Sequence, residues 1–388
     1  MQASGMSSGL SFMGDTKRIM KKILIVSTVS RQFYLFEQGN IEVLKSLDYE
    51  VHCAANFEDA NERLEALDII RHHFDIQRSP FSFRNIKAYK QLKKIMQSDR
   101  FNAVHCHSPM GGVLARLAAK SVGIPMVLYT AHGFHFYKGA PLMNWIIYYP
   151  VEKWLSRYTD ILITINKEDY NRAQRFKAKK IVYVPGIGVD TGKFDDETIN
   201  RAKKRKELEI SNDTIVLLSV GEMIKRKNHD TALKAISELK NKNYIYLICG
   251  QGELETYLKD LANKLGVSEK VRFLGFRDDI PEICAMSDIF IFPSYQEGLP
   301  VAAMEAMAAG LPVICSNIRG NVDLIQDGEG GYLLEPGDYI EIALSIDKVI
   351  KDDKLRINMG FRNKEEVKKC DKKVVKEKMK KIYLTVLR

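Results

Sequence analysis

The alternation of short apolar runs with helical patterns is the feature of this chain that most restricts its fold. Runs rich in β-branched residues recur throughout, for example at 22–28, 160–165, 214–219 and 289–292. The further runs are 50–55, 103–107, 126–130, 181–184, 244–248, 271–274, 312–315 and 331–334. Continuous apolar strands that alternate with helices predict parallel sheets covered by helices on both faces. Because the pattern restarts near residue 214, we expect an α/β fold of two doubly wound domains that face each other across a cleft.

The length of 388 residues agrees with two domains, because a single core rarely grows so large. We expect an N-terminal domain at 20–192 and a C-terminal domain at 193–365, with a glycine-rich hinge at 184–192. The Lys-rich segment 366–388 is expected to form a helix that crosses back to the first domain. Residues 1–19 are rich in Ser, Gly and Met, and we expect them to be a disordered leader without a secretory signal.

Composition narrows the class of protein but does not choose its partner. No apolar run approaches the roughly 20 residues of a membrane span. The six cysteines form no CxxC pair, so we read them as reduced, buried thiols of a cytoplasmic protein. The formal net charge of +10 is compatible with nucleic acid, an anionic membrane or phosphorylated substrates.

The segment 297–305 carries the strongest chemical signal. A helix is expected to open near Pro300 directly after a strand, with Pro300 in its first turn and free amides exposed at its positive end. Glu297 precedes this helix and Glu305 lies within it, so two carboxylates flank an anion site of diphosphate size. One could bind sugar hydroxyls and the other ribose hydroxyls. The alternative is an acidic loop followed by a surface glutamate. The residues expected around the anion are Gly298, Leu299, Pro300 and Val301.

Two further loops of the second domain follow predicted strands. Gly221 opens a loop that carries Arg226 and Lys227, which suit phosphate as a bidentate and a point cation; the alternative is a solvated basic turn. Gly275 and Phe276 end another strand, where backbone groups could read the edge of a nucleobase. There the alternative is an ordinary turn between a strand and a helix.

Histidines mark the first domain. His132 and His135 follow a predicted strand, and His132 precedes a glycine, so its side chain could reach a ligand in the cleft; the alternative is a structural histidine. His105 and His107 flank Cys106. We expect no metal site there, because neighbouring strand residues point to opposite faces and no acid or further cysteine lies near in sequence. No DxD pair stands out as a holder of a divalent ion beside a diphosphate.

A basic helix is predicted from residue 84, after Phe81 and Phe83. Its cations are Arg84, Lys87, Lys90, Lys93 and Lys94. The plain interpretation is a helix that covers a sheet and turns a solvated basic face outward. The alternative is that the cations rest on an anionic bilayer, at about 1 kcal/mol for each well-placed cation. The aromatic segment 143–149 is expected either to pack in the core or to form a groove for an acceptor lipid.

Together these motifs resemble the retaining GT-B glycosyltransferases of the large family that builds bacterial capsule, exopolysaccharide and lipopolysaccharide. The resemblance rests on Glu297 with Glu305, on Lys227, on the Gly275 loop and on His132, and it extends from about Met20 to the end. Asp288 and the hinge at 184–190 also fit the family. The segments 130–138 and 165–169 look most like its capsule and exopolysaccharide subgroup.

The resemblance implies two Rossmann-like domains (GT-B) and a role for each site residue. Arg226 and Lys227 would bind the donor diphosphate, and Glu305 the ribose. Glu297 would contact the donor sugar, and His132 would lie near the reacting sugar. Many members carry Arg directly after the glycine at position 221; here Glu222 stands there, so Arg226 must supply the guanidinium. The segment 28–32 also lacks the Gly-Gly turn common after the first strand.

We therefore predict a retaining, metal-independent hexosyl- or N-acetylhexosaminyl-transferase without a cofactor. Its expected donor is a UDP-sugar, and its acceptor a lipid-linked saccharide in bacterial surface polysaccharide synthesis. The protein is expected to be peripheral on the inner face of the cell membrane and to bind its anionic surface. The alternatives are a GT-B nucleotide-sugar epimerase and a non-catalytic membrane- or polyanion-binding protein. Nucleic acid is not an expected partner, because the basic helix lacks interleaved stacking aromatics.

Overall fold

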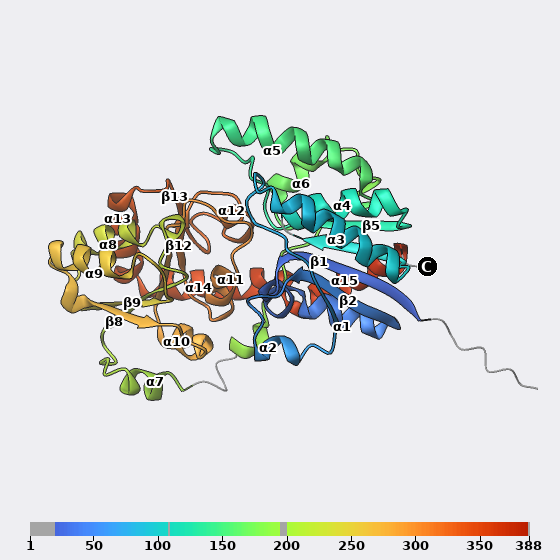
Figure 1. Ribbon diagram of the computed structural model, residues 1–388. Helices are drawn as coiled ribbons and strands as arrows, with labels where there is room; N and C mark the ends of the chain where they lie inside the picture. Colours follow the sequence, from blue (N-terminus) through green and yellow to red (C-terminus); the bar gives the residue numbers. More distant parts are fainter. Residues whose placement is uncertain (1–19, 108, 195–199, 387–388) are drawn as a thin grey trace, which may run out of the picture.

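The computed structural model describes residues 20–107, 109–194 and 200–386, so the expected leader 1–19 lies outside the described residues. Two parallel sheets form two lobes (Figure 1). The first has the order β3-β2-β1-β4-β5-β6-β7 and the second β10-β9-β8-β11-β12-β13. The first contains β1 (Lys21–Val29), β2 (Tyr49–Asn56), β3 (Ile70–His73), β4 (Ala103–His107), β5 (Met126–Ala131), β6 (Ile161–Thr164) and β7 (Lys180–Tyr183). The second contains β8 (Ile215–Val220), β9 (Tyr244–Cys249), β10 (Val271–Gly275), β11 (Ile289–Phe292), β12 (Val313–Ser316) and β13 (Gly331–Leu334).

Every apolar run proposed from the sequence forms a strand of these sheets, and the α/β fold of two doubly wound domains is confirmed. The central strands are apolar at successive positions because both of their faces are covered; Ile23, Leu24, Ile25 and Val26 of β1 are fully buried. The sequence analysis missed β3. That strand lies at the edge of its sheet and its residues are mostly exposed, so its sequence shows no apolar run.

The helices cover both faces of each sheet. In the first lobe they are α1 (Gln38–Ser46), α2 (Glu62–Glu65), α3 (Arg84–Ser98), α4 (Pro109–Val122), α5 (Leu142–Leu155) and α6 (Lys167–Ala173). In the second they are α7 (Arg201–Glu207), α8 (His229–Ser237), α9 (Glu255–Lys264), α10 (Ile280–Met286), α11 (Val301–Ala308), α12 (Asn321–Leu324), α13 (Tyr339–Lys351) and α14 (Asp353–Val367). Helices α3, α4 and α5 share one core with the first sheet, whereas α1 and the last helix, α15 (Lys372–Val386), pack on its other face.

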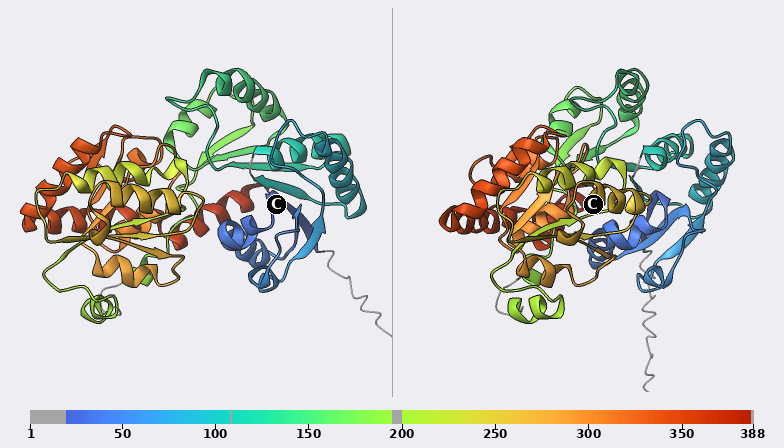
Figure 2. Two further views of the ribbon diagram at one scale, coloured as in Figure 1. Left: turned by 60° about the vertical axis from the view of Figure 1, so that its left-hand side comes forward. Right: turned by 90° about the vertical axis from the view of Figure 1, so that its left-hand side faces the viewer.

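The C-terminal helix α15 belongs in space to the first lobe (Figure 2). Met379 and Tyr383 are buried against the first sheet, and Lys376 forms an ion pair with Glu42 of α1. The Tyr383 hydroxyl lies 2.8 Å from Nδ1 of His105 on β4. The chain therefore crosses between the lobes twice, once near the hinge and once before α15.

The expectation of one helix over 366–388 is wrong in one respect, because the chain turns at Lys368–Cys370 and Asp371 before α15 begins. The Asp371 carboxylate accepts hydrogen bonds from the Thr191 amide at 3.2 Å and hydroxyl at 2.6 Å. Val189 and Asp371 also form a parallel bridge. The two crossing segments are thus bonded to each other, and the bend lets both pass side by side.

All six cysteines are free and buried. None of the helices in the described part of the chain combines the length and the apolar character that crossing a bilayer requires.

Candidate active site

A cavity of about 310 Å³ lies between the lobes, where the carboxyl ends of the strands face each other. Its wall brings together the basic loop after β8, the Glu297 loop after β11 and the His132 loop after β5. The described residues with polar or charged side chains that line it are Gln32, His132, Arg226, Gln296, Glu297 and Arg319. These loops, which are separate in the sequence, therefore meet in one cleft.

Glu297 is the centre of charge in this cavity. Its carboxylate oxygen accepts from Lys227 Nζ at 2.8 Å and from Arg226 Nη1 at 3.0 Å, and the residue is only 7% exposed. Lys227 also lies 4.8 Å from the ring centre of Phe292. Two cations share one carboxylate, so the cluster keeps a net positive charge suited to an anionic ligand.

The turn that carries these cations is fixed to the neighbouring loop. Lys225–Lys227 form one 3-10 turn, and Asn228 then adopts a left-handed conformation with φ of 57°. The Asn228 side chain donates to the Pro293 carbonyl at 2.9 Å, and the Tyr295 amide donates to the Arg226 carbonyl at 2.9 Å. A Cβ atom at Gly221 would lie 3.3 Å from Lys227 Cε, so glycine at this position leaves room for the lysine side chain.

Helix α11 begins one residue later than expected. Pro300 is its N-cap, with an extended conformation at φ −76° and ψ 121°, rather than a member of the first turn. The reason is that its ψ lies outside the helical range, so the helix starts at the next residue. The amides of the first helical turn at Val301 have no intrahelical partner, and the helix dipole adds positive potential there. The predicted anion site at Gly298, Leu299 and Val301 thus lines the cavity.

Other predicted residues lie outside this cavity wall. Glu305, in the second turn of α11, is largely buried; burial raises its pKa to about 7, although nearby Lys372 and Lys193 favour the ionised form. Gly275 ends β10, where its carbonyl accepts from the Gly250 amide at 2.7 Å. Phe276 is 63% exposed. The structure does not bring Gly275, Phe276 or Glu305 into contact with the Glu297 cluster.

Arg319 is a central residue that the sequence analysis missed. It follows β12, yet it donates to the Phe134 carbonyl at 2.8 Å and to the Asp169 carboxylate at 3.1 Å, both in the first lobe. Its Nε donates to the Glu297 carbonyl at 3.1 Å, and the residue is 6% exposed. A cation at the carboxyl end of a predicted strand was the available signal. Arg319 therefore joins the two lobes beside the cavity.

Glycine is required at one close backbone approach between the two lobes. A Cβ atom at Gly298 would lie 2.3 Å from the carbonyl oxygen of His132, which is closer than two such atoms can come. Across the same contact, the Asp323 carboxylate accepts from the Lys167 amide at 2.8 Å. The loop after β11 and the loop after β5 are thus in backbone contact.

His132 lies in a cluster with His107 and Glu37, which corrects the argument from sequence that no acid lies near these histidines. His105 and His107 point to the same face of β4, with ring centres 4.1 Å apart, since they are two residues apart in a strand. An acid does approach, because Glu37 ends a π-helical turn, Phe33–Glu37, that follows β1. Its Oε1 lies 3.0 Å from His107 Nδ1 and 3.8 Å from His132 Nε2. The missing acid came from a segment remote in sequence.

Burial controls the protonation of this cluster. It lowers the pKa of His132 to about 4 and that of His107 well below its usual value, so both rings are neutral at pH 7. It raises the pKa of Glu37 to about 7, against hydrogen bonds from Asn40 and Gln32 that favour the ionised form.

Helix α3 has the predicted core face, formed by Ala88, Leu92 and Met96. Its other face carries the predicted cations Arg84, Lys87, Lys90, Lys93 and Lys94, of which Lys87 pairs with Asp75 at 2.6 Å. In the segment 143–149, Trp145 and Tyr149 pack around Phe136, as the core interpretation expected.

The two facing sheets with a cleft between them have the GT-B architecture. Residues 22–166 match the model of the "Glycosyl transferase 4-like" family, and residues 200–366 match "Glycosyl transferases group 1". EpsD of Bacillus subtilis (strain 168), which carries a glycosyltransferase name, is 38% identical over 94% of this chain and 96% of its own length. The chain therefore belongs to the group 1 glycosyltransferases of GT-B fold.

Two further comparisons extend this assignment. An Escherichia coli protein named UDP-Gal:alpha-D-GlcNAc-diphosphoundecaprenol alpha-1,3-galactosyltransferase is 32% identical over 74% of this chain and 77% of its own. The crystal structure of HepE from Anabaena, in complex with UDP and glucose, superposes with a TM-score of 0.77 at 18% identity. That comparison covers 94% of this chain and 100% of HepE, and it shows a shared fold.

Replacing Arg319 tests the contact between the lobes. Arg319→Met leaves the fully buried Asp169 without its cation and should lower the free energy of unfolding by about 3 kcal/mol. Adding Asp169→Asn should recover part of the loss, because the uncompensated charge is removed. Urea unfolding measures both. Arg362→Met, at an exposed ion pair, serves as the control and should change stability by less than about 1 kcal/mol. If Arg319→Met and Arg362→Met lost the same free energy of unfolding, Arg319 would not be a stabilising contact between the lobes.

Glu305 should make stability depend on pH. Its raised folded pKa means that its contribution is greatest below the unfolded pKa and is lost as pH rises towards about 7. Relative to Glu305→Gln, the wild type should therefore lose on the order of 2 kcal/mol between pH 5 and pH 8. Urea unfolding of both proteins at the two pH values, without nucleotide, gives this difference. A difference independent of pH would show that the carboxyl group is not desolvated.

Proposed function

We propose that this glycosyltransferase moves a hexosyl or N-acetylhexosaminyl group from a UDP-sugar to a lipid-linked saccharide, with retention, in bacterial surface polysaccharide synthesis. The observation that carries the proposal is the convergence of Arg226 and Lys227 on Glu297 beside the start of α11. The printed name of the Escherichia coli relative, with its UDP donor and diphosphoundecaprenol acceptor, supports both substrate classes.

The proposed donor site divides its ligand among separate groups. Arg226, Lys227 and the amides that follow Pro300 bind the diphosphate, where charge develops as the sugar leaves. Glu297 orients these cations and binds a donor-sugar hydroxyl, and Glu305 binds the ribose. Gly275 and Phe276 face the base. The loops that begin at Gly221 and Gly275 both leave the carboxyl edge of the second sheet. This shared edge supports the assignment of the Gly275 loop to the base.

The proposed mechanism is attack from the face that the diphosphate leaves. Glu297 is the one carboxylate among the described residues that line the cavity, and two cations hold it, which makes it a poor nucleophile. The bond between the anomeric carbon and the diphosphate oxygen breaks while the acceptor oxygen bonds to the same face. The leaving phosphate oxygen takes the acceptor proton. His132 is assigned to the reacting sugar in this mechanism, and its closeness to Gly298 supports that role.

We propose that residues 20–192 bind the acceptor, that 193–365 bind the donor, and that the first lobe rests on the inner membrane face. Helices that follow parallel strands begin at the carboxyl edge of the sheet, so α3 and α5 both start near the cleft. Exposed apolar side chains gather at these starts. They are Phe81, Phe83, Ile86, Leu142, Met143 and Ile146. With the cations of α3 they form an apolar and basic rim suited to an anionic bilayer.

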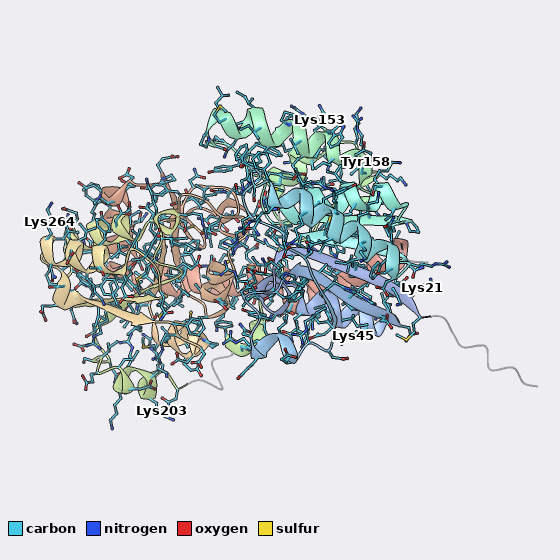
Figure 3. All side chains as sticks on the ribbon, in the orientation of Figure 1. Lys21, Lys45, Lys153, Tyr158, Lys203 and Lys264 are labelled. Atoms are coloured by element: carbon cyan, nitrogen blue, oxygen red, sulfur yellow. The ribbon has the colours of Figure 1, made fainter. Side chains whose placement is uncertain are left out.

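The outlying lysines argue against a channel for a polyanion. Lys21, Lys45, Lys153, Lys203 and Lys264 lie around the periphery of both lobes rather than along one face (Figure 3). These five cations do not line up as the single basic stripe that a channel for a polyanion would need.

Ligand binding tests the donor site. UDP and UDP-sugars should raise the melting temperature, GDP and ADP should raise it less, and Lys227→Ala should lose the effect. Lys225→Ala, an exposed lysine of the same turn, is the matched control. Glu297→Ala should keep the fold and lose at least about 100-fold in transfer. Near-normal turnover of that variant would remove Glu297 from the mechanism, and conversion of donor without an acceptor would favour the epimerase.

Vesicle flotation tests the rim. The protein should bind vesicles that contain both phosphatidylglycerol and phosphatidylcholine. It should not bind vesicles made only of phosphatidylcholine. Lys90→Gln with Lys94→Gln should weaken binding by roughly 25-fold, at about 1 kcal/mol for each cation. Phe83→Ser should also weaken it, whereas Phe361→Ser, at another exposed phenylalanine in the second lobe, should not. Equal effects of the two phenylalanine changes would contradict this surface.

A further inference from the structure

Four side-chain atoms converge at the floor of the cleft in the first lobe. His107 Nδ1 lies 3.0 Å from Glu37 Oε1 and 3.1 Å from His132 Nε2. The Gln32 amide group lies 3.1 Å from the same Glu37 oxygen and 3.2 Å from His132 Nε2. Glu37 Oε1 and His132 Nε2 are 3.8 Å apart. These atoms come from the turn after β1 and from the carboxyl ends of β4 and β5.

The separations match those of ligands around one metal ion. Zinc binds imidazole nitrogen and carboxylate oxygen at about 2.0–2.2 Å in a tetrahedron, which places its ligand atoms roughly 3.3–3.6 Å from one another. Two histidines with one glutamate are also a recognised zinc donor set. The geometry therefore needs only small adjustments to close around an ion.

Charge and burial favour a cation at this point. Glu37 is 1% exposed, and no lysine or arginine of residues 20–107, 109–194 and 200–386 forms an ion pair with it. A buried carboxylate without a positive partner is costly. His107 Nδ1 and His132 Nε2 both face this carboxylate oxygen, and imidazole nitrogen is a common ligand of zinc.

The surroundings also resemble those of a built metal site. The second oxygen of Glu37 accepts from Asn40 Nδ2 at 2.7 Å, which fixes the carboxylate as outer hydrogen bonds fix metal ligands. Glu37 is presented by a π-helical turn, a distortion frequent at functional sites. A cavity of about 290 Å³, lined by Glu37, His107 and His132 and extending to α15, offers an entry path.

We propose that Glu37, His107 and His132 bind one divalent transition-metal ion of the zinc class, with the amide oxygen of Gln32 as the fourth ligand. Exchange of the Gln32 amide oxygen and nitrogen requires only a half-turn of the group. The ion fixes the turn after β1 to the strand ends and holds the His132 ring beside the cleft. It is a separate site from that of the donor diphosphate, and the inference does not depend on the proposed reaction.

A second group of possible ligands is weaker and supplies the control. His52, His72 and Asp99 lie close together near the edge of the first sheet. However, His52 Nε2 is bonded to Glu50 at 2.6 Å, and Asp99 pairs with Lys22 at 3.2 Å. The Asp99 carboxylate is already neutralised by a lysine, whereas Glu37 has no lysine or arginine partner among the described residues, so we expect no tight binding at the second group.

The test is metal binding by the full chain after treatment with a chelator. Calorimetric titration with Zn²⁺ should show one tight site in the absence of any nucleotide. Co²⁺ in its place should give the intense visible absorption of tetrahedral coordination. Glu37→Gln, which keeps the side-chain shape, and His107→Asn should each weaken Zn²⁺ binding at least 10-fold. His72→Ala should leave the affinity unchanged.

The wild type decides the matter even if a variant fails to fold. A folded, chelator-treated wild type that binds no Zn²⁺ more tightly than about 100 μM would overturn the proposal and leave a hydrogen-bonded cluster. Loss of the tight site in His72→Ala, but not in Glu37→Gln, would also overturn it. UDP binding in the presence of the chelator is measured separately, so failure of the donor site and failure of the metal site are distinguishable.

Discussion

The buried ion pair between Arg319 and Asp169 makes one cleft out of two separately folded sheets. Arg319 extends from the second lobe, bonds the Phe134 carbonyl of the first and also holds the backbone of Glu297. The pair is almost fully buried. Separating the lobes would therefore leave each charge without its partner, which is costly unless water solvates both charges. The relative position of the His132 loop and the Glu297 loop follows from this contact and from the missing Cβ of Gly298.

Electrostatic organisation differs on the two sides of the cleft. On the second lobe, Glu297 is paired with two cations, which suits a diphosphate that arrives with its own negative charge. On the first lobe, Glu37 meets only neutral partners among the described residues, which suits a cation or a polar network. His132 lies between these two arrangements, because its ring belongs to the Glu37 cluster and its carbonyl oxygen lies against Gly298, the residue after Glu297. One histidine thus lies between the proposed anion site of the second lobe and the polar cluster of the first lobe.

The site could be predicted from sequence only where its residues adjoin a strand or a helix start. Arg226, Lys227 and Glu297 each follow a recognisable apolar strand, and the carboxyl ends of parallel strands share one edge. Arg319 also follows a strand, but nothing in the sequence tells which opposite group it meets. Glu37 gave no signal, because it ends a π-helical turn remote in sequence from His107 of β4, which its carboxylate meets.

The sequence by itself determined the two parallel sheets, since buried central strands must be apolar at every position and therefore stand out. It also determined the donor-side motif, which is local. Only the tertiary structure decided that α15 packs on the first lobe, that Arg319 joins the lobes, and that Glu37 reaches His107 and His132. These contacts join residues remote in the chain. Their geometry depends on how whole sheets pack, which no local pattern of residues encodes.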